Sequence, residues 1–144
     1  MPKLDLERIR PEPAGQSPPE FTEAARGRVV KVLDRASGLA DFVATHVVPP
    51  PGGWSAQRHW HEGEDELAVI LTGHAVLVDE TGRHPMGPGD VAVFPKDDRN
   101  AHHLRNEGDE PVTILAVSLP ERSPVHYPDI GRRLVPGQGF SDER

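Results

Sequence analysis

The sequence predicts an all-β protein, a barrel or sandwich of antiparallel strands. Its 144 residues include 16 prolines and 14 glycines, more than long helices tolerate. Short apolar segments alternate with turn signals, and no helical periodicity separates them. The length suits a single domain, because a second independent core would need more sequence.

Eight short segments have the composition of strands, and each ends near a glycine, proline or Asn/Asp turn. In chain order they are Arg28–Asp34, Leu39–Val48, Ala56–His61, Glu66–Thr72, Ala75–Asp79, Asp90–Phe94, His102–Arg105 and Val112–Leu119. We therefore expect a barrel over residues 28–120. Residues 1–27 are rich in proline and are expected to form an extended arm with one helical turn around Glu20–Arg26. Residues 121–144 are polar and are expected to pack on the barrel as a tail or to be flexible.

The composition argues against several classes of protein. There is no cysteine, which excludes disulfides and thiolate-bound metals and fits a cytoplasmic protein. The formal charge is -7 and the basic residues form no stripe, so we expect no nucleic-acid partner. The longest apolar run, Leu67–Leu71, is too short to span a membrane, and the first residues resemble no secretory signal.

The segment His59-Trp60-His61 has the pattern of a metal-binding strand. Residues i and i+2 of a strand face the same side, so both imidazoles point one way and Trp60 points the other. Two adjacent imidazoles suit a divalent metal ion, although an exposed pair on an edge strand is the simpler interpretation of this motif alone.

Glu66 opens the apolar run Leu67–Leu71, where a buried carboxylate needs a cation or hydrogen-bond donors beside it. The preceding residues Glu62, Glu64 and Asp65 are better explained as a solvated turn. Farther along, His102-His103 offers a third imidazole from another strand, and only one of the two can face the same side as Glu66.

Three imidazoles and one carboxylate together make a site for iron(II), manganese(II), nickel(II) or zinc, with open positions for a substrate. The predicted ligands are His59, His61, Glu66 and His102. The other histidines, His46, His74, His84 and His126, have no partner at ligand spacing and are expected at the surface.

At this point the residues resemble the cupin superfamily. Its first motif, G-x5-H-x-H-x4-E-x6-G, is matched in every spacing from Gly53 to Gly73. Its second motif, G-x5-P-x-G-x2-H-x3-N, is matched by Gly89, Pro95, His102 and Asn106, with two differences. Asp97 stands where glycine is usual, and the interval from Pro95 to His102 is two residues longer. The spacing to Asn106 selects His102 rather than His103 as the ligand, and Asn106 itself is expected to secure a turn.

The resemblance implies a double-stranded β-helix (jelly roll) with the metal inside the barrel mouth, and a homodimer in which the N-terminal segment often contacts the partner. The stretch from Phe94 to Asn106, with Tyr127-Pro128-Asp129-Ile130, looks like small bacterial cupins often labelled sugar-phosphate isomerases. Cupins host many activities, so the fold does not fix the reaction.

Three functions follow as hypotheses. In the first hypothesis, the protein is a sugar or sugar-phosphate isomerase, in which a metal polarises a chelated carbonyl and a side chain moves a proton. Alternatively, it is an iron(II)-dependent dioxygenase, or a non-catalytic metal-dependent module that binds or senses a small molecule.

The sequence assigns no catalytic acid or base; the candidates by residue type are Glu62, Glu64, Lys96 and Tyr127. The candidate cations for a phosphate are Arg58, Lys96 and Arg105, although strand alternation argues against the two arginines. The expected pocket-lining residues are Ala68, Ile70, Phe94 and Leu104.

Overall fold

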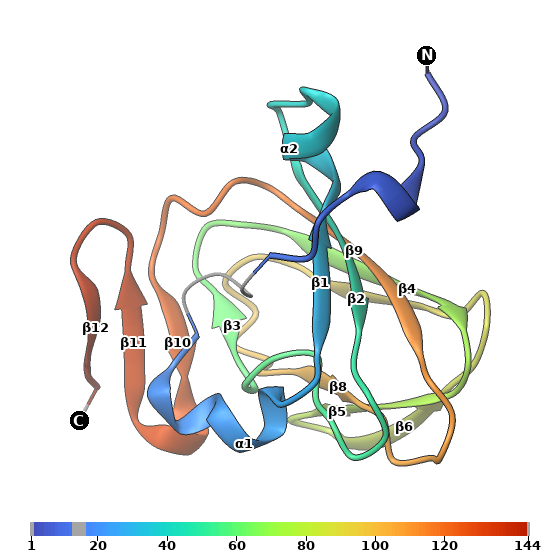
Figure 1. Cartoon of the computed structure of the whole chain (residues 1–144). Coiled ribbons are helices and arrows are strands. Elements are labelled where there is room, and N and C mark those ends of the chain that lie inside the picture. Colours follow the sequence, from blue (N-terminus) through green and yellow to red (C-terminus); the bar gives the residue numbers. More distant parts are fainter. Residues whose placement is uncertain (1, 13–16, 144) are drawn as a thin grey trace.

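The computed structural model describes residues 2–12 and 17–143, and its strands form a barrel of antiparallel sheets (Figure 1). One sheet has the order β1 (Val29–Val32), β2 (Val43–Val48), β9 (Thr113–Ser118), β4 (Glu66–Thr72) and β7 (Val91–Phe94). A second sheet contains β12 (Gly139–Asp142), β11 (Arg132–Val135), β10 (Val125–Tyr127) and β3 (Trp60–His61). A third contains β6 (Gly82–Met86), β5 (Ala75–Asp79) and β8 (His103–Arg105). This architecture confirms the predicted all-β double-stranded β-helix.

Two isolated bridges connect the second and third sheets. Trp54 pairs with Arg105, and His59 pairs with His102, so the segment before β3 runs antiparallel to β8. The two smaller sheets thus form one wall of the barrel, opposite the five-stranded sheet. In Figure 1, β10, β11 and β12 lie on one side of the barrel and β4 on the other.

Helices are few and short. They are η1 (Leu6–Arg8), η2 (Pro19–Phe21), α1 (Thr22–Ala25), α2 (Leu33–Ser37) and η3 (Pro128–Ile130). The predicted helical turn around Glu20–Arg26 is confirmed by η2 and α1. Within the described ranges, no helix has the length and apolar character needed to cross a membrane.

The strand predictions succeed where apolar residues dominate and fail where they do not. β4 and β5 have the predicted bounds, whereas β6 and β10–β12 were not predicted. β6 contains Pro85, which is tolerated because β6 is the edge strand of its sheet. β10–β12 are short and polar, so their pairing carries little sequence signal. The predicted strand Leu39–Val48 begins only at Val43, after α2 and its left-handed Gly38.

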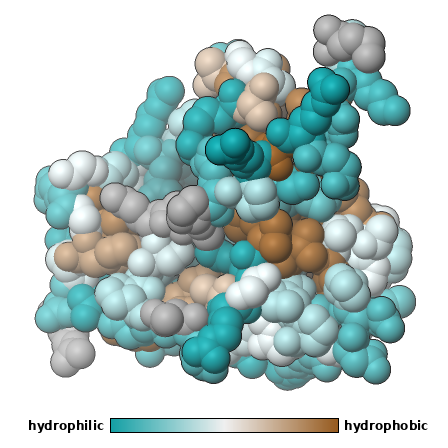
Figure 2. Space-filling model, in the orientation of Figure 1, coloured by the Kyte–Doolittle hydropathy of each residue, from teal (hydrophilic) through white to brown (hydrophobic). Residues whose placement is uncertain are grey.

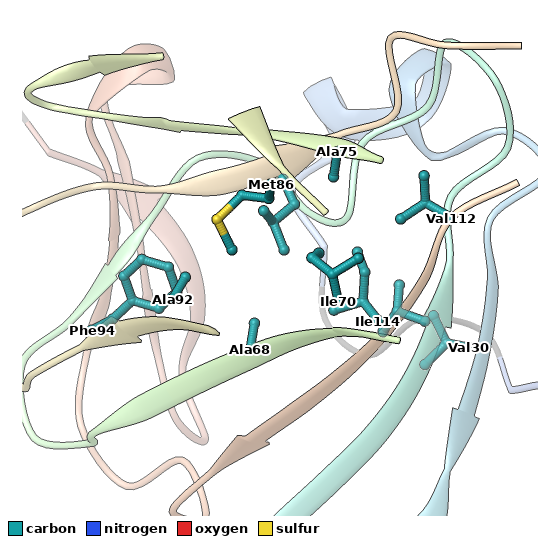
Figure 3. Close-up of a cluster of buried hydrophobic side chains, with 11 residues drawn as sticks. Val30, Ala68, Ile70, Ala75, Met86, Ala92, Phe94, Val112 and Ile114 are labelled. Atoms are coloured by element: carbon teal, nitrogen blue, oxygen red, sulfur yellow. The ribbon is translucent and has the colours of Figure 1, made fainter. Parts of the chain in front are cut away.

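The barrel interior holds the main hydrophobic cluster (Figure 3). Its side chains come from both walls: Val30, Val47, Ala68, Ile70, Ala75, Met86, Ala92, Phe94, Leu104, Val112 and Ile114. A second cluster of Val125, Tyr127 and Leu134 joins β10 to β11. Buried apolar area of this kind supplies most of the stability of a barrel and fixes which strand faces point inward.

The N-terminal arm contacts the barrel at several points. The amide of Glu12 donates to the carbonyl of Val30, 2.8 Å away, beside the edge strand β1. Phe21 is 1% exposed and stacks on Trp54, with ring centroids 6.5 Å apart. The amide of Trp54 donates to Ala24 O in turn, so α1 closes one end of the barrel.

Candidate metal centre

The two walls of the barrel bring the predicted ligands together. His59 and His102 are direct cross-strand partners, since each amide donates to the carbonyl of the other at 3.1 and 2.9 Å. Directly opposite residues of an antiparallel pair project their side chains to the same face. Their rings lie 4.9 Å apart between centroids, and the ring of His61 lies 5.0 Å from that of His59.

Glu66 reaches this cluster from the opposite wall, at the start of β4. Its Oε1 lies 3.2 Å from His102 Nε2, and its Oε2 lies 3.4 Å from His61 Nε2. One donor atom each from His59, His61 and Glu66 falls within 4.8 Å of the others. Two ligands that share an ion at about 2.1 Å, at tetrahedral or octahedral angles, are about 3.0–3.4 Å apart. The separations around Glu66 therefore have the size that a shared ion requires.

Hydrogen bonds orient two of the rings for ligation. His59 Nδ1 lies 2.7 Å from Gln57 O, and His102 Nδ1 lies 2.9 Å from Asn100 O. A carbonyl only accepts, so each Nδ1 carries the proton and each Nε2 presents its lone pair, as in histidines that bind metals. In the described residues, neither ring nitrogen of the buried His61 makes a hydrogen bond. Such unsatisfied nitrogens are costly unless something occupies their lone pairs.

The electrostatics of the cluster favour a charged Glu66 carboxylate and a neutral His59 ring, whereas His61 binds a proton more readily than an ordinary histidine. Burial, with His102 next to it, lowers the pKa of His59 to about 3. Burial raises the pKa of Glu66, but the His102 and His61 side chains lower it by more. The pKa of Glu66 is therefore well below its usual value. Burial lowers the pKa of His61, but the nearby carboxylates of Glu66, Glu121 and Glu64 together raise it by more. A divalent metal needs deprotonated donors of both kinds, so it would compete with a proton for His61.

His103 faces away from this cluster. Its Nδ1 lies 2.9 Å from Ala56 O, and its Nε2 accepts a hydrogen bond of 2.9 Å from Arg105 Nε. The edge of its ring meets Trp54 at 4.6 Å between centroids. His102, the residue selected by spacing, is thus the one beside Glu66.

A cavity of about 290 Å³ opens beside the cluster. Of the residues expected in its wall, Ala68, Phe94 and Leu104 line it, and Phe94 stacks on His102 with centroids 3.4 Å apart. Ile70 does not line it: this side chain is 0% exposed and packs in the main hydrophobic cluster. The size suits a small molecule.

Most of the candidate proton carriers are occupied elsewhere. Glu64, expected in a solvated turn, is 3% exposed and accepts hydrogen bonds from the amides of Arg122 and Ser123. Glu62 contacts His126 at 2.6 Å. That histidine is 7% exposed, so its expected surface position is wrong. Lys96 is exposed and is not part of the cavity wall.

Two groups that can transfer protons do line the cavity. Tyr127 on β10 is buried, with its ring 5.8 Å from that of His59, and burial raises its pKa. Glu121 follows β9 and lies at the opening, where partial burial and the nearby Glu64 and Glu66 carboxylates raise its pKa despite His61. Glu121 was not predicted, since it lies in a polar loop with no motif.

None of the three candidate cations lines the cavity, as strand alternation had argued for the two arginines. Arg58 binds Asp129 at 2.7 Å and Glu80 at 2.8 Å, away from the cavity. Arg105 lies over Trp54 and donates to His103. The arginine in the cavity wall is Arg28, which sequence reasoning did not select.

The loop from Pro95 to His102 explains why Asp97 can replace the usual glycine. Asp97 has φ +57°, in the left-handed region that glycine adopts readily and Asp tolerates better than most residues. Its amide donates to His61 O at 2.9 Å, which ties the longer loop to the strand that carries His61. Asn106 secures the turn that follows β8, as expected, through its bonds to Pro49 O and Glu110 O.

Known proteins match this chain across the barrel. The Cupin domain family matches residues 45–118. A crystal structure from Silicibacter pomeroyi, named as a sugar phosphate isomerase from the cupin superfamily, is 36% identical, covers 97% of this chain and 90% of its own, and has a TM-score of 0.88. A predicted oxalate decarboxylase from Thermotoga maritima is 25% identical over 81% of this chain and 97% of its own, with a TM-score of 0.61.

A curated relative, the oxalate-binding protein of Thermotoga maritima, is 37% identical over 70 residues, which make up 49% of this chain. That match covers 55% of the relative, so the chain spans about half of its length.

Proposed function

Because the chain belongs to the cupin family, we propose that its buried cluster binds one divalent metal ion, as the centre of an isomerase-like enzyme acting on a sugar or sugar phosphate. The proposed ligands are His59, His61, Glu66 and His102. The observation that carries the proposal is the convergence of His59, His61 and Glu66 from opposite walls beside a small cavity. His102 joins them through its Nε2, which lies 3.2 Å from Glu66 Oε1. The donor set suits iron, manganese, nickel or zinc.

A bound metal of this kind would act as a Lewis acid on a carbonyl and its neighbouring hydroxyl. The protein must then move a proton between adjacent carbons. Glu121 is the proposed base, because it lies at the cavity opening and its raised pKa brings it closer to neutral pH. Tyr127 keeps its proton and is placed to donate a hydrogen bond to a substrate oxygen.

The metal assignment is tested by measuring metal content after purification without added metal, and again after reloading. We expect about one ion per chain in the wild type. His59→Ala and His61→Ala should lose most of it while the barrel stays folded, and His74→Ala, an exposed histidine, should not. Unchanged metal content in the first two variants would exclude the assignment.

The reaction class is tested on the metal-loaded protein with a panel of sugars and sugar phosphates in D2O. An isomerase that moves the proton through a base such as Glu121 incorporates solvent deuterium at the carbon next to the carbonyl. Glu121→Gln should lower this rate by about 100-fold with metal content unchanged. Oxygen uptake with bound iron would instead favour the dioxygenase. Saturable ligand binding without turnover would favour the non-catalytic module.

We also propose that the protein forms a homodimer through the outer face of the five-stranded sheet. This face exposes apolar side chains at Leu67, Leu71, Val91 and Val93, the last of which is 65% exposed. Figure 2 shows hydrophobic surface gathered over β2, β9 and β4. Apolar area of this extent marks an interaction surface. Light scattering of the wild type and of Val93→Lys tests this, with a dimer expected for the first and a monomer for the second.

A further inference from the structure

Arg28 has an unusual position for a cation, since it immediately precedes β1 and lines the same cavity as the histidine cluster. Its guanidinium lies over the ring of Phe21, 4.7 Å from the centroid, and its Nη1 donates to Ser55 O. These two contacts fix the side chain with its charged end in the wall. A guanidinium held in this way loses little further entropy when it binds a ligand.

The charge of Arg28 is not balanced by the protein. Arg58 forms ion pairs with two carboxylates, and Arg132 forms ion pairs with Glu20 and Asp142. Across residues 2–12 and 17–143, no carboxylate lies within ion-pair distance of Arg28. Burial lowers its pKa to about 10, so the group remains charged at neutral pH. A partly buried charge without a counter-ion is unfavourable, and an anion from solution would relieve the cost.

The register of the sheet separates Arg28 from the metal cluster. Glu66 pairs with Ser118, which pairs with Val43 at one end of β2. Val29, next to Arg28, pairs with Val48 at the other end. On the opposite wall, Ser55 lies four residues before His59, at most about 14 Å away along the chain. A single small molecule in the cavity can therefore approach both sites.

We propose that Arg28 forms an oxyanion subsite, which binds the phosphate or carboxylate group of a small substrate while the opposite end of that molecule lies at the histidine cluster. The cavity wall between them carries Thr45 and Gln57, which can hydrogen-bond to hydroxyl groups. Planar guanidinium donors match both kinds of oxyanion bidentately. This inference rests on the proposed function in placing the substrate in this cavity, and it adds an anionic group to the substrate class.

The test measures binding of inorganic phosphate and of succinate to protein stripped of metal, at constant ionic strength. Arg28→Met should weaken phosphate or succinate binding at least tenfold, and Arg28→Lys should weaken it less because the charge remains. Arg26→Met is the matched control: Arg26 is exposed, lies two residues away and pairs with Glu23, so binding should not change. The tighter of the two probes identifies the oxyanion that the subsite prefers.

Arg28→Met also removes the contacts with Phe21 and Ser55, so an independent measurement uses the wild type. The Nε–H resonance of Arg28 should shift on titration with the tighter probe. The absence of a shift, no binding of either anion by the wild type, or equal binding by Arg28→Met would overturn the proposal. Arg28→Met separates this from the metal assignment, because it should lose anion binding but keep the metal content of the wild type.

Discussion

Replacing His103 by glutamine tests the distinct environments of the two adjacent histidines. His103 is 2% exposed, and burial lowers its pKa to about 4 despite the hydrogen bond to Ala56 O. The neutral ring donates through Nδ1 and accepts from Arg105 through Nε2. A second proton would sit on Nε2, against the Arg105 guanidinium. The folded protein therefore resists protonation of this residue, whereas the unfolded chain does not.

The size and sign of the effect follow from linkage. A histidine with a lowered pKa contributes stability above its unfolded pKa of about 6.5, and this contribution is lost as the pH falls to the folded value. A pKa that is about 2.5 lower in the folded state than in the unfolded state corresponds to about 3 kcal/mol in the free energy of unfolding. We expect the free energy of unfolding to fall by up to that amount between pH 6.5 and 4 because of His103. His103→Gln removes this contribution, so its stability should depend less steeply on pH.

The assay is urea unfolding of metal-free protein followed by tryptophan fluorescence at several pH values. His74→Gln, at an exposed position, serves as the control and should follow the wild-type pH dependence. Reloaded His103→Gln should also bind metal as the wild type does. The same pH slope in His103→Gln and wild type would refute the buried neutral state, and loss of metal would refute the assignment of His102.

Four further predictions concern the site and its support. Bound metal should be released as the pH falls below about 6.5, because protons compete for the imidazoles and the raised pKa of His61 makes it the first to protonate; full metal occupancy at pH 4 would contradict this. Gly73→Ala should destabilise the fold by at least about 2 kcal/mol in thermal unfolding, since Gly73 has φ +78° and a Cβ there would lie 2.5 Å from Pro111 O. Gly89→Ala, with φ +88° but open space, should cost about 1 kcal/mol. Asn106→Ala should cost about 2–3 kcal/mol in urea unfolding, because two carbonyls lose their partner, and a change below the error of the measurement would exclude that role.

The strand-forming segments that carry the proposed ligands were predictable from local pattern. Alternation places His59 and His61 on one face, and Glu66 opens an apolar strand with bounds that match the prediction. The spacing to Asn106 already selected His102 over His103, and the pairing of strands agrees with that choice. The bridge between His59 and His102 shows which of the two lies beside Glu66.

The groups around the cluster were not predictable in the same way. Glu121 and Arg28 lie outside the motifs, and Gln57 is at a variable position of the first one. Each reaches the cavity because distant segments close over it. Glu64 and His126 look like surface residues in the sequence, yet contacts with residues 17 to 64 positions away bury them. Charge and polarity alone do not show whether a partner exists across the barrel.

By itself, the sequence determined the class of fold and the type of donor set, because strand periodicity and ligand spacing are local properties of the chain. The tertiary structure decided which cations lack a counter-ion, which carboxylates face the cavity and where the cavity ends. Those properties depend on contacts between walls that are far apart in the sequence, and no short-range pattern encodes them.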